Sequence, residues 1–444
     1  MTTIAPLNKS VTDWLYLNPE RKEVTHCPLC EQTANFSALS DVPKLAGMQL
    51  VMCQHCGFVT YNPQPLDISK YYSECVRQQS LEFIHTKHSK LVYHKNLIGK
   101  FAKENELYFE SVLDYGSSDG YLLDYLSETN RTSHDGCVGV EVNKGHANWA
   151  KMIKGFDVRQ DADLSQFESE QFQLIVLYHV LEHIQSPKRF LQEVISKIAL
   201  GGYLYLALPT MNRIDYDLPF PMQGKGGTIF FKDEHINLFT DETLARLLES
   251  CGLEIQFSDH VLYGTCYIAK KTRNVDLPLD NTGLYEKAVA TYRTMMECYA
   301  LKLQMDEAAT HDIPKALLLG KQAILRQPLF PQLVQKVAAL HIDFIEQQDL
   351  FSEYLALYPN EIKIWLSYGM VCFQEQDFAK AKEIFLSIME RWGNIDNATI
   401  QLFHIAYFEK DFESLKKYMQ LLMKDGGESD PYKISLIGSV LTQL

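Results

Sequence analysis

The segment 111–126 constrains the fold most strongly, because it places a glycine-rich turn between an apolar run and a helix-forming run. Residues 111–115 (SVLDY) are typical of a short strand, residues 116–120 (GSSDG) of a turn, and residues 121–126 (YLLDYL) of the start of a helix. Glycines let the backbone of such a turn approach a ligand, and the helix N-terminus offers it positive partial charge. The segment therefore predicts a nucleotide-binding strand–turn–helix unit.

The alternation of strands and helices continues to about residue 209. Further strands are expected at 136–141, 156–158, 172–177 and 203–208. The run 172–177 is almost wholly apolar, as strands buried on both faces are. A helix is expected over 190–200, ended by Gly201 and Gly202. The pattern predicts an α/β fold with a doubly wound sheet. Glu141 ends the second strand, where an acid commonly accepts both hydroxyls of a ribose.

Four cysteines near the N-terminus form two CxxC pairs, Cys27 with Cys30 and Cys53 with Cys56. Each CxxC turn can place two thiolates on one tetrahedral ion, and two turns complete its shell. Zinc is the default ion for such a shell, and a full shell leaves no position for chemistry, so we expect a structural Zn²⁺ site. Four unrelated buried cysteines are the plainer alternative. A redox role for the first pair lacks the surrounding βαβ unit.

Composition limits the class of protein and its partners. A chain of 444 residues suggests two or three domains. The formal net charge of −14 disfavours nucleic acid, whose phosphates require a basic face. No stretch approaches the about 18 apolar residues that span a bilayer, and no signal peptide is evident. Ten cysteines without a secretory signal argue against a disulfide framework, so we expect a cytoplasmic protein.

From residue 112 to about 259 the chain resembles the class I S-adenosylmethionine-dependent methyltransferases, and this implies a Rossmann-like sheet. It is most similar to a branch whose members often methylate sugars and carry a CxxC…CxxCG module. The matching positions are Asp114, Gly116, Gly120, His179–His183, Pro187, Gly201–Gly202, Pro209, Glu234–His235, Phe239–Thr240, Leu244, Leu247, Leu248 and Gly252. Asn62–Pro65 and Tyr71–Tyr72 continue the N-terminal match. The resemblance covers roughly residues 25–260 and is specific for fold and cofactor, less so for substrate.

The resemblance implies a set of residues around S-adenosyl-L-methionine. The turn would cradle the methionine end, Glu141 the ribose, Asp161 and Ala162 the adenine, and His179 would pack at the cofactor's edge. The residues of the turn with the preceding acid are Asp114, Gly116, Ser117, Ser118 and Gly120. Ser118 stands where the family's middle glycine is usual. Serine is small, so we expect cofactor binding to be retained.

Methyl transfer needs alignment of the acceptor and removal of its proton. The candidates for the base are Tyr178, His179, Glu234 and His235, which follow the fourth and fifth expected strands. The resemblance favours Glu234 and His235. Alternatively, His235 hydrogen-bonds a loop and organises the turn at Phe239, while Glu182 and His183 are structural. Residues 210–232 carry aromatic residues and glycines and are interpreted as a lid over the acceptor or as a packed surface loop.

The last third of the chain has a helical pattern. The Asp-Phe pairs at 377–378 and 411–412 are 34 residues apart, which is the tetratricopeptide period. Earlier helices are expected over 316–326 and 331–348. Repeats of this kind bind protein segments or mediate self-association. A plain helical cap on the catalytic domain is the alternative.

The sequence thus predicts three domains: a zinc-binding module (1–74), a methyltransferase domain (75–277) and a helical-repeat domain (278–444). The expected function is methyl transfer to a small-molecule acceptor, a nucleotide-linked sugar or surface glycan. Two other hypotheses stay open. In one, the chain is a non-catalytic scaffold that recruits partners through its repeats. In the other, which the segment His179–His183 and the Glu234–His235 turn disfavour, it is an NAD-dependent reductase.

Overall fold

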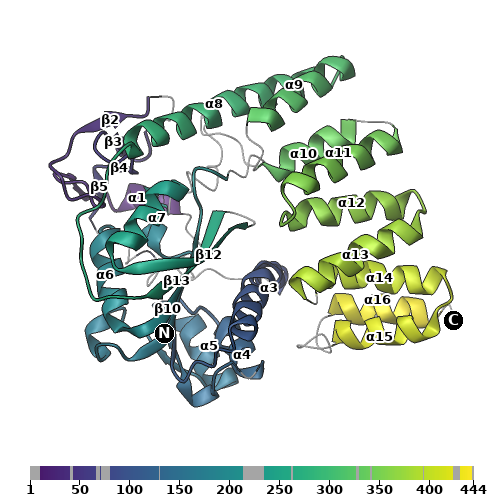
Figure 1. The fold of residues 1–444 in the computed structure, drawn as a ribbon, viewed down its shortest axis with the longest axis horizontal. Helices are drawn as coiled ribbons and strands as arrows, with labels where there is room; N and C mark the ends of the chain where they lie inside the picture. Colours follow the sequence, from purple (N-terminus) through teal and green to yellow (C-terminus); the bar gives the residue numbers. More distant parts are fainter. Residues whose placement is uncertain are drawn as a thin grey trace, which may run out of the picture. The chain divides into compact units, whose positions relative to one another are not determined.

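The computed structural model describes most of the chain (Figure 1), and this chain falls into two compact units. The described residues are 11–40, 44–66, 71, 81–129, 131–213, 235–261, 264–326, 330–340, 343–393, 395–423 and 431–442. Unit 1 comprises Met1–Ile84, Ile98–Leu303 and Gln322–Gln332, and unit 2 comprises His85–Leu97, Gln304–Lys321 and Leu333–Leu444. The domain boundaries at residues 74 and 277 stay predictions.

Unit 1 is built on a seven-stranded mixed sheet. Its strands are β6 (Val112–Tyr115), β7 (Cys137–Val140), β8 (Asp157–Arg159), β9 (Phe172–Tyr178), β10 (Ile198–Leu208), β12 (Leu253–Val261) and β13 (Gly264–Lys271). The order across the sheet is β12-β13-β10-β9-β6-β7-β8. The five strands from β10 to β8 are parallel, whereas β13 runs antiparallel to both β10 and β12. The parallel part confirms the predicted strands, while the antiparallel pair was not predicted.

Helices line the connections between these strands. They are α4 (Tyr121–Glu128), α5 (Lys144–Lys154), α6 (Pro187–Lys197) and α7 (Asp241–Ser250), while α3 (Leu81–Glu104) precedes the first strand of the sheet. The expected helix at 190–200 is wrong at both ends. It begins at Pro187, since proline is tolerated at the first helical position, and it ends before Ile198, which pairs with Phe172 in the sheet. Gly201 and Gly202 lie within β10, where its register with β9 shifts.

A second, four-stranded sheet brings the N-terminal module to a distant loop. Its order is β11-β4-β3-β2, formed by Asn237–Leu238, Val59–Asn62, Gln49–Cys53 and Phe36–Ala38. A two-stranded sheet pairs β1 (Arg21–Lys22) with β5 (Gln64–Pro65). Strand β11 pairs with β4 so that Asn237 lies opposite Thr60. The module is therefore continuous with the segment that directly follows His235.

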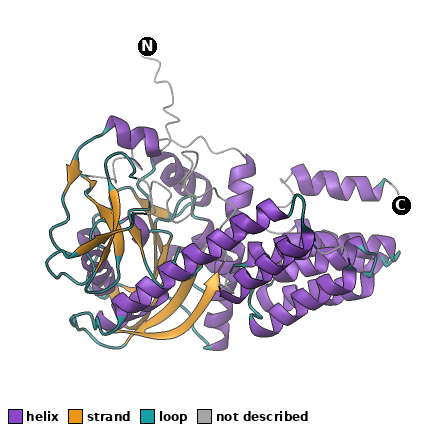
Figure 2. Cartoon of the chain, turned by 90° about the horizontal axis from the view of Figure 1, so that it is seen from above, coloured by secondary structure: helices purple, strands orange, loops and turns teal. Residues whose placement is uncertain are grey.

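Unit 2 is helical in its described residues, and all described strands belong to unit 1 (Figure 2). The helices of the last third are α8 (Leu284–Ala308), α9 (Ile313–Arg326), α10 (Pro331–Leu340), α11 (Phe344–Leu357), α12 (Ile362–Gln374), α13 (Phe378–Trp392), α14 (Asp396–Phe408), α15 (Phe412–Met423) and α16 (Pro431–Leu441). Helices α12 and α14 begin 34 residues apart, as do α13 and α15. The predicted helix 331–348 is wrong, because α10 ends at Leu340 and Asp343 caps a new helix. None of the described helices has both the length and the apolar character needed to cross a bilayer.

Candidate functional site

The turn after β6 has the backbone conformation that its glycines predict. Gly116 and Gly120 have φ angles of +88° and +74°, a region that favours glycine. The N–H groups of Gly116 and Ser117 both donate to the carbonyl oxygen of Val140 on β7, at 2.8 and 3.0 Å. Gly120 then caps the N-terminus of α4. The predicted strand–turn–helix unit is confirmed, and the turn lies at the carboxyl edge of the parallel strands.

Ser118, at the position of the family's middle glycine, has a φ angle of +51°. Such a conformation costs a residue with a Cβ roughly 1 kcal/mol. The Ser118 hydroxyl lies 3.2 Å from Nδ1 of His146 on α5. The hydroxyl is therefore accommodated against α5.

Glu141 follows β7, and two backbone groups orient its carboxylate. The N–H of Ser118 donates to Oε2 at 2.9 Å, and the N–H of Asn143 donates to Oε1 at 2.7 Å. A carboxylate has about four acceptor sites, which is more than these two backbone donors use. The carboxylate is thus held at the glycine turn in an orientation that two vicinal hydroxyls could use.

The segment after β8 carries Asp161 and Ala162, the residues predicted to contact adenine. The Asp161 carboxylate accepts a hydrogen bond from the N–H of Asp163 at 3.0 Å. The Tyr115 hydroxyl donates to the carbonyl oxygen of Ala162 at 2.9 Å. Burial, with a smaller contribution from Glu193 and the two aspartates, raises the pKa of Tyr115 to about 12, so the phenol stays a donor. Tyr115, which sequence analysis did not single out, ties this segment to β6.

Beyond β9, three histidines surround one buried carboxylate. The Glu182 side chain is 0% exposed and lies in a single 3-10 turn, Leu181–His183. Its Oε1 is 3.1 Å from Nδ1 of His179 and 3.8 Å from Nε2 of His183. The ring centroid of His235 is 4.9 Å from that of His183. Burial raises the pKa of the Glu182 carboxyl, but His183, His179 and His235 outweigh it and lower that pKa to about 2.

The structure therefore brings most of the predicted catalytic residues together. The ring centroids of Tyr178 and His179 are 4.5 Å apart. His235 lies in the same cluster, although it is 56 residues after His179 in the chain. The central residue is Glu182, which the sequence alone assigned only a structural role. The spacing His179-x-x-Glu182-His183 is the signal that could have found it. Glu234 and residues 214–232 of the predicted lid lie outside the described residues.

The N-terminal module holds the loop of His235. The Thr60 hydroxyl lies 3.0 Å from both the Ile236 carbonyl oxygen and Oδ1 of Asn237. Gln64 donates to the same hydroxyl at 2.8 Å, and the Asn237 amide donates to the carbonyl oxygen of Ile184. His235 and His183 are thus each next to a residue that this hydrogen-bonded network fixes.

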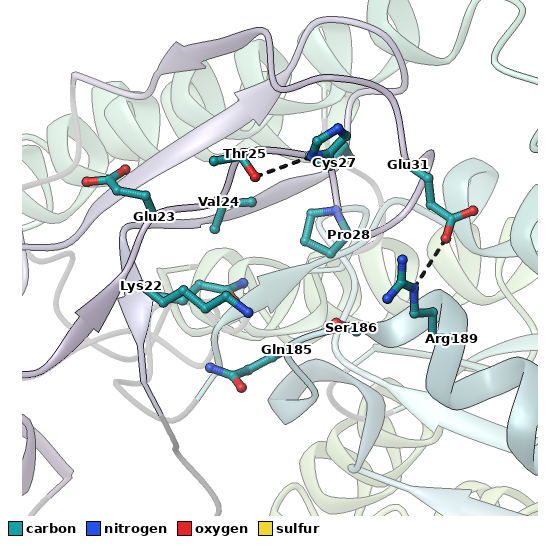
Figure 3. A pocket seen from close by; sticks show the side chains of 12 residues that line it. Lys22, Glu23, Val24, Thr25, Cys27, Pro28, Glu31, Gln185, Ser186 and Arg189 are labelled. Carbon is teal, nitrogen blue, oxygen red and sulfur yellow. Dashed lines mark hydrogen bonds and ion pairs between the residues drawn. The ribbon is translucent and has the colours of Figure 1, made fainter.

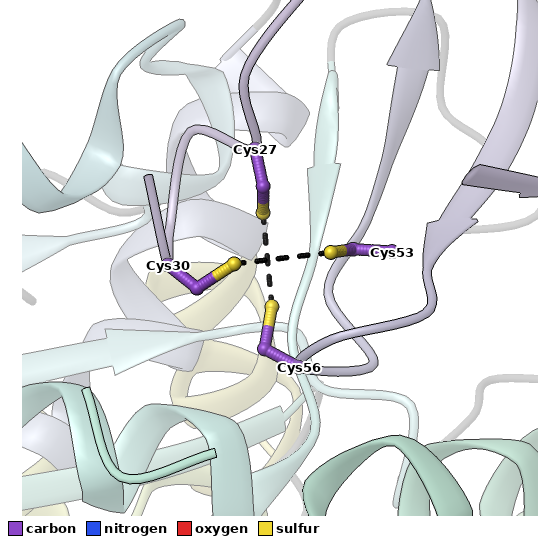
Figure 4. Close-up of side chains that lie close together, drawn as sticks. All are labelled: Cys27, Cys30, Cys53 and Cys56. Carbon is purple, nitrogen blue, oxygen red and sulfur yellow. Dashed lines mark hydrogen bonds between the residues drawn. The ribbon is translucent and has the colours of Figure 1, made fainter. Parts of the chain in front are cut away.

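The four cysteines of the module converge on one point (Figure 4). The sulfur atoms of Cys27 and Cys56 are 3.7 Å apart, and those of Cys30 and Cys53 are 3.8 Å apart. In a tetrahedral site with Zn–S bonds of about 2.3 Å, the sulfur atoms lie ~3.8 Å from each other. All four side chains are buried. The donor set and its spacing fit a tetrahedral thiolate-bound ion.

A cavity of about 400 Å³ lies between the module and the start of α6 (Figure 3). Its lining residues are Lys22, Glu23, Val24, Thr25, His26, Cys27, Pro28, Glu31, Gln64, Gln185, Ser186 and Arg189. Glu31, one of these residues, forms ion pairs with Lys188 at 2.8 Å and with Arg189 at 3.5 Å. The cavity is lined by amides and charged groups, and Gln185 is two residues from His183.

Comparison with known proteins supports the interpretation of residues 87–256 as a methyltransferase domain. Residues 87–256 match a family model described as a methyltransferase domain. Over 111 residues the chain is 29% identical to the mitochondrial ubiquinone biosynthesis O-methyltransferase of Candida albicans, a match that covers 23% of this chain. The chain spans about a third of that relative's length (33%).

Several solved methyltransferase structures are similar to the chain, and two are given as examples. An S-adenosylmethionine-dependent methyltransferase from Aquifex aeolicus has 17% identity and a TM-score of 0.32, with 44% of this chain and 100% of that chain covered. The 1,6-didemethyltoxoflavin-N1-methyltransferase of Burkholderia thailandensis has 17% identity and a TM-score of 0.31, with 49% and 96% covered.

Proposed function

We propose that this protein transfers a methyl group from S-adenosyl-L-methionine to a small-molecule acceptor, and the match of residues 87–256 to a methyltransferase-domain model supports this proposal. The observation that carries the proposal is the direct hydrogen bond between the glycine turn and Glu141. It joins the two elements that a nucleoside with an amino-acid tail would have to contact together.

The chain's own residues would bind and orient the cofactor, which supplies a methyl group on a positively charged sulfur. The turn Gly116–Gly120, with Asp114 behind it, would hold the methionine end. Glu141 would accept the ribose hydroxyls, and the segment at Asp161 and Ala162 would flank the adenine. His179, directly after β9, would close the edge of this site next to the acceptor.

The acceptor's proton would pass to an imidazole of the Glu182 cluster, either His179 or His235. The buried Glu182 carboxylate lies 3.1 Å from Nδ1 of His179 and would orient that imidazole towards the acceptor. The His179 side chain is 27% exposed and His235 is 4% exposed, so His179 has the more accessible ring. Tyr178 and Glu234 remain proposed contributors.

For the four cysteines we propose a structural zinc ion. Its support is the tetrahedral sulfur spacing and the strand order of the module. Cys53 ends β3, β3 pairs with β4, and β4 holds the segment after His235. The ion would thereby stabilise the loop that carries a proposed catalytic residue.

The proposal also covers the class of the acceptor and the partners of the helical repeats. The resemblance to sugar-modifying methyltransferases favours a nucleotide-linked sugar or surface glycan, and the polar cavity near Gln185 suits a polyhydroxylated molecule. The 34-residue offsets of α12–α15 favour tetratricopeptide-like repeats, which would bind a protein segment or a second copy of the chain.

Isothermal titration with S-adenosylhomocysteine tests the function. Micromolar binding is expected, and NADH should not bind. Absence of S-adenosylhomocysteine binding would instead favour the scaffold. Turnover of candidate glycans should then be lost in His179→Ala or His235→Ala while S-adenosylhomocysteine affinity changes little.

A further inference from the structure

We propose that Glu182, His183 and His235 form a second metal site, distinct from the four cysteines, that takes a divalent transition-metal ion. The ion binding is independent of methyl transfer, but its role beside the acceptor rests on the proposed function. Each of the three residues offers one ligand atom, and these atoms all lie within 4.8 Å of one another. The site would stand directly after β9, next to His179.

The chemistry of the three side chains favours a transition metal. Two imidazoles and one carboxylate are a donor set that binds Zn²⁺ or Fe²⁺ and leaves coordination positions open. The shell differs from the four thiolates, which would fill all the positions of their ion. Bonds of about 2.1 Å place tetrahedral ligand atoms ~3.4 Å apart, so the side chains would close by roughly 1 Å around the ion.

The burial of Glu182 favours a bound cation. The carboxylate is 0% exposed, and neither oxygen has a hydrogen bond of good geometry among the described residues, although His179 lies 3.1 Å away. A buried carboxylate is costly unless it is paired or coordinates a metal. Within this cluster, a divalent ion would supply the positive partner that the buried carboxylate requires.

The surrounding fold holds the ligands in place, as metal sites require. Asn237, two residues after His235, donates to the carbonyl oxygen of Ile184, the residue after His183. Thr60 of the N-terminal module holds Asn237 in turn. His179 would then be an outer residue that orients Glu182, which leaves its imidazole to accept the acceptor's proton while His235 binds the ion.

Metal analysis of the full chain tests the site. The purified protein is loaded with excess Zn²⁺, desalted, and its zinc content measured by mass spectrometry. We expect two ions per chain for the wild type and one for Glu182→Gln and for His183→Asn. The matched control is His260→Asn, which removes an imidazole whose Nδ1 is 3.7 Å from the Asp241 carboxylate and should leave the count at two.

Loading with Co²⁺ distinguishes the two sites. The Glu182→Gln protein should keep the intense thiolate-to-cobalt absorption and lose only the weak bands of a nitrogen–oxygen site. One ion in the wild type, or two in both variants, would refute the second site. Titration with S-adenosylhomocysteine separates this outcome from failure of the proposed function: a chain that binds the nucleoside but only one ion refutes the metal site alone.

Discussion

The backbone N–H of Ser118 donates a 2.9 Å hydrogen bond to Oε2 of Glu141. This contact joins the turn after β6 to the acid after β7, and Asn143 fixes the other carboxylate oxygen. The two hydrogen bonds fix the orientation of the carboxylate at the proposed cofactor site, and a side chain held in this way reduces the ordering cost of binding.

Replacing Glu141 tests this arrangement. Glu141→Ala should weaken S-adenosylhomocysteine binding at least tenfold, because it removes the ribose acceptor and the partner of Ser118; about 1.4 kcal/mol corresponds to that factor. Glu141→Gln should also bind more weakly, since one amide end cannot accept from a backbone N–H. Titration calorimetry measures both. Glu168→Ala, an exposed acid in the same unit, is the control and should bind like the wild type.

Ser118 can be changed in two directions. Ser118→Gly removes the left-handed strain and should keep S-adenosylhomocysteine affinity within a few fold, with a stability gain of up to about 1 kcal/mol. Ser118→Val places a β-branched side chain at a φ of +51° and should weaken both folding and binding. Equal affinities for the glycine and valine variants would contradict the placement of this turn at the ligand.

The raised pKa of Tyr115 predicts a pH dependence of stability. The folded pKa is about 12, above the ordinary value of 10, so the unfolded chain loses this proton first as pH rises. The stabilising contribution is complete below pH 10 and declines towards pH 12, by up to about 1.4 kcal/mol per pH unit.

Tyr115→Phe should therefore be less stable than the wild type at pH 8, by about 1 kcal/mol for the lost hydrogen bond. The difference should shrink by pH 11. Urea unfolding followed by circular dichroism measures it. Tyr108→Phe, at a ring that is 53% exposed, should follow the wild type at both pH values, and parallel curves for Tyr115→Phe would contradict the pKa shift.

Removal of the proposed zinc should destabilise unit 1. Zinc added to metal-free wild type should raise the thermal unfolding midpoint, because an ion that binds only the folded state stabilises it. Cys53→Ser should lose most of this rise. Cys298→Ala, at a buried thiol remote in sequence from the CxxC pairs, is the control and should keep it. An equal zinc response in both variants would contradict the thiolate site.

Two glycines of the helical region should respond oppositely to alanine. A Cβ on Gly369 of α12 would lie 2.7 Å from the ring of Phe385 on α13, so overpacking should cost about 1–3 kcal/mol. A Cβ on Gly438 of α16 would meet no atom within 4 Å, so Gly438→Ala should gain up to about 1 kcal/mol in helix propensity. Urea unfolding distinguishes the two. Equal effects would contradict the packing of α12 on α13.

The elements that depend on residues close together in the chain could be predicted from the sequence. The five parallel strands, the turn at Gly116 and the two CxxC motifs each depend on residues close together in the chain. The 34-residue spacing likewise appears in the helix starts. The hydrophobic period, the glycine positions and the cysteine spacing each involve only a few neighbouring residues, so they can be recognised in the sequence without the structure.

Long-range pairing decided the rest. The pairing of β11 with β4 places His235 beside the module, and no local pattern around Asn237 encodes its partner Thr60. Gly201 and Gly202 resemble a helix end but lie in β10, because pairing with β9 outweighs local preference. The position of Glu182 among His179, His183 and His235 became evident only from the tertiary structure. Sequence alone thus determined the parallel core and the glycine turn that is proposed to hold the cofactor. Tertiary structure decided which side chains from distant parts of the chain surround the buried Glu182 carboxylate, since burial and pairing depend on the whole chain.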